Sequence, residues 1–234
     1  MALLLRGLCV LVLLGSVPVM RAQEVNSSSA GIAPITEYLM DRTVEIAMAR
    51  SAAPDSISSE ADVMILTPKG YEPAVKGSNG FVCIVERGWM NVFEDSDFGS
   101  TRLLSPMCLN PAAARSHLPV TMKRTKLALA RPSREAMRAS LLAAFNKNEL
   151  PVPEPGSMCY MMSKGAYFGD EQGHLFPHVM FFLQPAAVRE WGAGMKGSPL
   201  IALPDPDDRW TIVLLPVGKW SDGTPALAGG DHKH

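Results

Sequence analysis

The spacing of apolar and polar residues predicts helices in some parts of this chain of 234 residues and strands in others. Between residues 35 and 52, apolar side chains return with the period of a helix, and acidic side chains recur every four residues on another face. The acidic residues are Glu37, Asp41 and Glu45. Acidic stripes of this kind are typical of a solvated helix face, so we expect a helix whose carboxylates lie in water.

Beyond this helix the pattern changes to short runs of β-branched and aromatic residues, which predict strands. The runs cover residues 62–67, 71–76 and 81–87, and Asn79-Gly80 before the third run is a strong hairpin signal. We therefore expect a three-stranded antiparallel meander. In the third run, apolar residues occupy both alternating sets of positions, so much of this strand should be buried on both faces.

The middle of the chain begins with an irregular segment, residues 88–109, which we expect to be an ordered loop. Asn110 followed by Pro111 has the chemistry of an N-cap with proline at the first helical position. Ser133 is a second N-cap candidate, at the start of a well-patterned segment. The predicted helices span residues 112–117, residues 120–130 and the stretch from Ser133 to about residue 147.

Two apolar runs, Met158–Met162 and Val179–Leu183, predict a pair of strands at the centre of the sheet. They flank a glycine-rich polar connection, with His174 and His178 at its far edge. A last buried strand is predicted at Trp210–Val217.

This order of elements predicts an α+β fold, with an antiparallel or mixed β-sheet and several helices packed on it. We expect a single domain over residues 35–220, since a chain with 47% hydrophobic residues can bury a substantial single core. A flexible leader at residues 23–34 should precede the domain, and a disordered tail at residues 221–234 should follow it.

Residues 1–22 have the pattern of a secretory signal peptide. A short basic start at Arg6 is followed by an apolar run of about a dozen residues, shorter than the roughly 20 needed to span a membrane. Ala22 then offers a small residue for cleavage. We therefore expect export to the periplasm or the extracellular space, with no transmembrane segment left after removal of the signal.

The whole chain has a formal charge of −1, and without Arg6 and Arg21 of the leader the remaining 20 basic and 23 acidic residues give −3. Positive charge collects locally between Arg115 and Arg138. We interpret it as the outward faces of amphipathic helices paired with acidic loops, and the alternative is an anionic partner. Nucleic acid is disfavoured, because no aromatic stacking residues are interleaved with the basic ones.

Outside the leader the chain has three cysteines, Cys83, Cys108 and Cys159. An oxidising compartment favours one bridge and leaves one thiol over. Sequence alone allows three pairings. We favour Cys83 with Cys108, because closing a loop of about 25 residues contributes roughly 3 kcal/mol.

Three phrases at residues 49–54, 77–87 and 177–182 occur together: ARSAAP, GSNGFVCIVER and PHVMFF. As a set they resemble a family of uncharacterised exported bacterial proteins, over most of the chain that follows the leader. The resemblance implies a secreted bacterial protein and carries no known activity.

The chain contains no nucleophile elbow, phosphate loop, zinc-protease helix or dinucleotide fingerprint. Titratable residues are not concentrated around one pocket-like motif. The interpretation we favour is therefore an exported bacterial globular protein that acts as a non-catalytic binding or structural module. Its partner would be an unknown ligand or an envelope component.

Two alternatives stay open. The first is a soft-metal protein that binds copper or zinc through His174, His178 and Cys159, although methionine is spread through the chain as a general core residue. The second is a hydrolase-type enzyme that uses His174 or His178 as general base. Asp170, Glu171 or Cys159 would then be the partner of that base.

Overall fold

The computed structural model describes residues 32–167, 176–205, 207 and 209–226. The predicted signal peptide, most of the predicted leader, His174, Asp170 and Glu171 lie outside these residues. Within them the chain forms a mixed β-sheet with helices on both faces, which confirms the predicted α+β class. No helix among these residues is long and apolar enough to cross a membrane.

The sheet has eight strands in the order β2-β1-β3-β4-β5-β6-β8-β7. The strands are β1 (Asp62–Thr67), β2 (Gly70–Val75), β3 (Val82–Arg87), β4 (Leu104–Leu109), β5 (Met158–Met161), β6 (His178–Leu183), β7 (Ile201–Asp205) and β8 (Trp210–Pro216). All neighbouring strands are antiparallel except β1 and β3, which run parallel. The predicted central pair is confirmed as β5 and β6.

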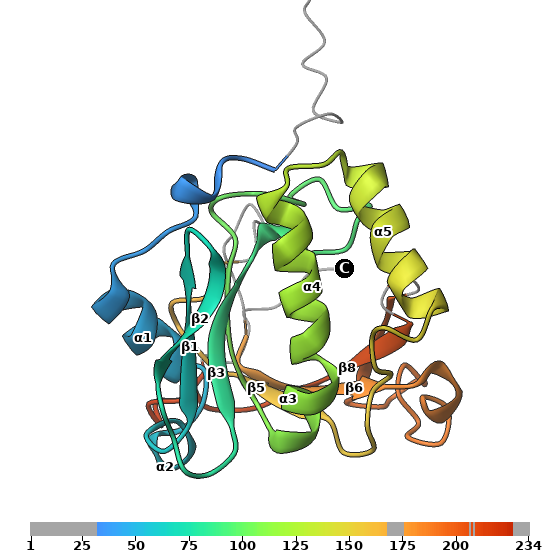
Figure 1. The fold of residues 1–234 in the computed structure, drawn as a ribbon. Helices are drawn as coiled ribbons and strands as arrows, with labels where there is room; N and C mark the ends of the chain where they lie inside the picture. Colours follow the sequence, from blue (N-terminus) through green and yellow to red (C-terminus); the bar gives the residue numbers. More distant parts are fainter. Residues whose placement is uncertain (1–31, 168–175, 206, 208, 227–234) are drawn as a thin grey trace, which may run out of the picture.

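Helices cover the sheet in two layers. They are α1 (Arg42–Arg50), α2 (Asp55–Ser58), α3 (Pro111–Ser116), α4 (Leu118–Leu129) and α5 (Arg134–Asn146). Helix α1 packs on β1, β3 and β4. Figure 1 shows α4 in front of the sheet, with α5 next to it.

Side chains of N-cap residues fix where several of the helices begin. Asn110 and Ser133 are N-caps as predicted, because their side chains accept hydrogen bonds from the backbone N–H groups of Ala113 and Ala136. The helix predicted from residue 35 begins only at Arg42. Asp41 caps it there, and a separate short 3₁₀ turn occupies Ile35–Glu37.

The prediction of an antiparallel meander is wrong for its third strand. β3 pairs with β1 rather than with β2, and it runs parallel to β1. The connection from β2 to β3 crosses the end of β1, where the Gly77 N–H donates to Asp62 Oδ1 at 2.6 Å. A Cβ on Gly77 would lie 2.3 Å from the backbone of Glu60, so only glycine fits this crossing.

The segment predicted as an ordered loop contains the strand β4, which lies between β3 and β5. Cys108 on β4 stands directly opposite Cys83 on β3, and a disulfide joins the two. This is the pairing predicted from the sequence. Cys159 on β5 is buried and forms no disulfide.

Successive side chains along each strand point to opposite faces of the sheet, and they form one apolar layer on each face. Ile84 on β3 and Met107 on β4 pack toward α4 and α5, in the same cluster as Leu141. Cys83 and Val85 project to the opposite face and pack with alanines of α1 and the turn that follows it. Strand β3 is therefore buried on both faces, as its sequence predicts.

The expectation of a fully solvated acidic stripe is wrong at Glu45, whose side chain is buried between α1 and the sheet. Its Oε1 accepts hydrogen bonds from Arg87 Nη2 at 2.8 Å and from the backbone N–H of Leu66 at 3.0 Å. Arg87 is also buried and donates to the carbonyl oxygens of Tyr38 and Val85. The carboxylate thus neutralises a cation inside the protein.

Some of the cationic side chains of the helical region form ion pairs with acidic residues of other segments. Arg115 forms an ion pair with Glu154, and Arg138 forms ion pairs with Glu94 and Asp207. These pairs agree with the interpretation of amphipathic helices paired with acidic segments, but Arg124 of α4 is fully buried and does not lie on an outward face.

The start of the segment predicted as a tail makes contacts with the domain. Ser221 donates its backbone N–H to the carbonyl of Met162, and Asp222 forms an ion pair with Lys164.

Candidate functional site

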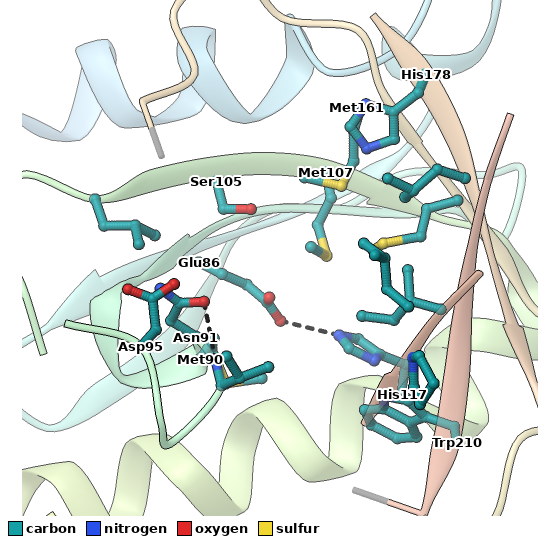
Figure 2. Close-up of a pocket in the computed structure, with 17 residues that line it drawn as sticks. Glu86, Met90, Asn91, Asp95, Ser105, Met107, His117, Met161, His178 and Trp210 are labelled. Carbon is teal, nitrogen blue, oxygen red and sulfur yellow. Dashed lines mark hydrogen bonds and ion pairs between the residues drawn. The ribbon is translucent and has the colours of Figure 1, made fainter. Parts of the chain in front are cut away.

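A cavity of about 520 Å³ opens on the face of the sheet that also carries α4 (Figure 2). Strands β3 to β8 form its floor, and the segment that follows β3 and the junction of α3 with α4 close its sides. The apolar part of the lining is made mainly by Met90, Met107, Met161, Met180, Ile212 and Leu214. The volume lies within the range of small-molecule sites, about 300–1,000 Å³.

Glu86 brings a carboxylate into this apolar wall. It lies on the same face of β3 as Ile84 and is only 3% exposed. Its Oε1 accepts a hydrogen bond from the Thr121 hydroxyl and lies 3.1 Å from Nε2 of His117. Oε2 receives no hydrogen bond from the described residues, so one carboxylate oxygen is left for a ligand.

His117 is held rigidly at the junction between α3 and α4. Its ring stacks on Phe182, with 4.1 Å between ring centroids, and it lies 5.0 Å from the ring of Trp210. Its Nδ1 is buried and has no hydrogen-bond partner among the described residues.

His178, the first residue of β6, stands at the opposite end of the cavity lining and is 3% exposed. Its Nδ1 lies 2.9 Å from the carbonyl oxygen of Phe176. Since a carbonyl only accepts, Nδ1 carries the proton, and Nε2 keeps a lone pair in the neutral ring. Burial lowers the pKa of His178, which favours this neutral form.

The structure places only one of the three predicted metal ligands at the cavity. His178 lines it, whereas Cys159 is fully buried and is not part of the lining. His174 lies outside the described residues. Within the described residues, no three side chains of His, Cys, Asp or Glu come together as a metal site.

The arrangement of a hydrolase is not found among the described residues. Ser105 lines the cavity opposite Glu86, but its hydroxyl makes no hydrogen bond to His117 or His178 there. Burial raises the pKa of the Cys159 thiol well above its usual value, which disfavours the nucleophilic thiolate. Asp170 and Glu171 lie outside the described residues.

Sequence reasoning missed Glu86, His117 and Trp210. Glu86 carried a usable signal, because it is a charged residue within a run predicted to be buried on both faces. A buried charge requires a partner, and such partners are common in binding sites. His117 gave no local signal, and Trp210 was predicted only as the first residue of a buried strand. Packing between distant segments brings both residues to the cavity.

Comparison of the chain with protein-family models, with curated proteins and with solved structures found no match. The function therefore has to be inferred from the geometry of the cavity.

Proposed function

We propose that this protein is an exported, non-catalytic binding module that holds a small, mainly apolar molecule in the cavity on the α4 face. The cavity itself carries the proposal: about 520 Å³ of space with a predominantly apolar lining and few polar groups. Pockets of this size and composition are typical of small-molecule sites. Export is supported by the signal-peptide pattern of residues 1–22.

Glu86 defines the polar part of the ligand. Its buried Oε1 is already bonded to Thr121 and lies beside His117, whereas Oε2 is unpaired within the described residues. A carboxylate oxygen in an apolar wall binds a cationic or strongly hydrogen-bonding donor. We therefore infer a ligand with an apolar body and an amine-type head group.

Displacement of a fluorescent apolar probe tests this proposal. N-phenylnaphthylamine, whose fluorescence rises in apolar surroundings, is bound first and then competed with decylamine or decanol. Hydrogen bonds to charged groups contribute about 1.5–3 kcal/mol, so Glu86→Gln should weaken decylamine binding roughly tenfold to a hundredfold. Decanol binding should change little, because its chain makes the same apolar contacts.

Decanol also serves as the control for folding of the Glu86→Gln variant. Equal weakening of both competitors would contradict the head-group assignment, because Glu86 would then act on the shape of the cavity. Failure of the wild-type protein to bind the probe or either competitor would contradict the binding proposal as a whole.

A further inference from the structure

Two thioethers and an imidazole form one row across three neighbouring strands. Met161 on β5 stands directly opposite His178 on β6. The register of β4 with β5, continued by one residue beyond the pair Cys108 and Tyr160, sets Met107 opposite Met161. Met107, Met161 and His178 all line the cavity, so the three side chains project from the same face of the sheet.

The spacing of the row suits a single ion. Strands lie about 4.8 Å apart, so the row from β4 to β6 spans roughly 10 Å. Methionine side chains are unbranched and have three rotatable bonds, which lets both sulfur atoms turn toward the central position. Figure 2 shows His178 and Met161 together at one end of the cavity, with Met107 between them and Glu86.

The ring of His178 is oriented by a backbone hydrogen bond of the kind found in metal-binding histidines. Such histidines usually donate their other ring N–H to a backbone carbonyl or carboxylate, which fixes the tautomer and the ring orientation. His178 does so through Nδ1 to the carbonyl of Phe176. Its Nε2 has no hydrogen-bond partner among the described residues, although the side chain is almost fully buried and faces the cavity.

We propose that this row binds one copper(I) ion through the sulfur atoms of Met107 and Met161 and through Nε2 of His178. Thioether and imidazole ligands are soft or borderline and suit copper(I), whereas divalent zinc prefers thiolate, imidazole and carboxylate. All three ligands are neutral, which fits a monovalent cation in an apolar wall. This set replaces two of the ligands expected from sequence, Cys159 and His174, and does not rest on binding of an apolar molecule.

Competition for copper(I) with bicinchoninate, under anaerobic conditions with ascorbate, tests the site. Replacing a residue that hydrogen-bonds to a metal ligand typically costs about 10–100-fold in metal affinity, so loss of two direct ligands should cost at least about tenfold. The double variant Met107→Leu/Met161→Leu keeps the apolar volume and should show this loss, as should His178→Gln. Met137→Leu, at a fully buried methionine of α5 outside the cavity lining, should bind like the wild type.

Binding of N-phenylnaphthylamine by the double variant serves as the control for the shape of the cavity. Retained probe binding with weakened copper(I) binding supports the site and keeps it separate from the apolar-ligand proposal. Unchanged copper(I) affinity in the double variant would overturn it. So would loss of copper(I) binding in Cys159→Ala alone, or zinc binding that depends on Met107 and Met161.

Discussion

Replacing Glu45 by alanine should destabilise the protein strongly, because it leaves the buried guanidinium of Arg87 without its counter-charge. Glu45 is fully buried and lies 2.8 Å from Arg87 Nη2. Removing one partner of a buried ion pair costs about 3–5 kcal/mol, against a total stability of about 5–15 kcal/mol for a typical domain. The Leu66 N–H also loses its acceptor. At roughly 2–4 °C per kcal/mol for a domain of this size, Tm should fall by about 6–20 °C.

Urea denaturation followed by circular dichroism measures the effect. Glu45→Gln keeps an acceptor for Leu66 and removes only the charge, so it should cost less than Glu45→Ala. The double variant Glu45→Leu/Arg87→Met should also cost less than Glu45→Ala, because no isolated charge remains buried. A loss below about 1 kcal/mol in Glu45→Ala, the range of exposed pairs, would refute the reasoning.

Three further predictions concern the cysteines and the loss of stability at acidic pH. A protein of residues 23–234, without the predicted signal peptide, should show one reactive thiol when it is denatured unreduced and none when it is native, since burial raises the pKa of Cys159. Three thiols after denaturation would contradict the disulfide. Replacing Cys83 and Cys108 together by alanine should cost about 3 kcal/mol in urea denaturation, and unchanged stability would contradict this contribution. The hydrogen bond from the Gly77 N–H lowers the pKa of Asp62 in the folded protein. The Asp62 carboxylate therefore stabilises the fold above its unfolded pKa, about 3.9, and this stabilisation is lost as pH falls through the folded pKa. Below about pH 4, the free energy of unfolding measured in urea should therefore fall less steeply with pH in Asp62→Asn than in the wild type. An equally steep fall in both proteins would contradict this prediction.

Local chemistry made part of the fold predictable. Asn110 and Ser133 start helices through hydrogen bonds to N–H groups only three residues away, so the sequence itself contains both partners. The pair β5 and β6 was predictable because both strands are strongly apolar. The bridge between Cys83 and Cys108 is the pairing that the sequence analysis favoured.

Features that depend on distant pairing were not predictable. The parallel contact of β1 with β3 requires the chain to cross the end of β1 at Gly77, and nothing local distinguishes this from a meander. Strand β4 carries Pro106, a residue that normally argues against a central strand. Glu45 belongs to a regular acidic stripe, and only the position of Arg87 after folding shows that it is buried.

The candidate site was predictable only in part. His178 was selected from its place beside an apolar strand, and it does line the cavity. Methionines that the sequence analysis treated as general core filler form a large part of the same lining, because alternation along β4, β5 and β6 brings them to one face. The contact of Glu86 with His117 arises from packing of helix on sheet, which no sequence pattern encodes.

Titration of N-phenylnaphthylamine into two variants of β8 tests the binding proposal most directly. Leu214 faces the cavity, whereas Leu215 projects to the other face of the same strand and is also half-buried. Leu214→Trp should fill the cavity and weaken probe binding at least about tenfold, which corresponds to 1.4 kcal/mol. Leu215→Trp should bind the probe like the wild type. Equal binding by both variants, or no fluorescence increase with the wild-type protein, would contradict a ligand-binding cavity on this face.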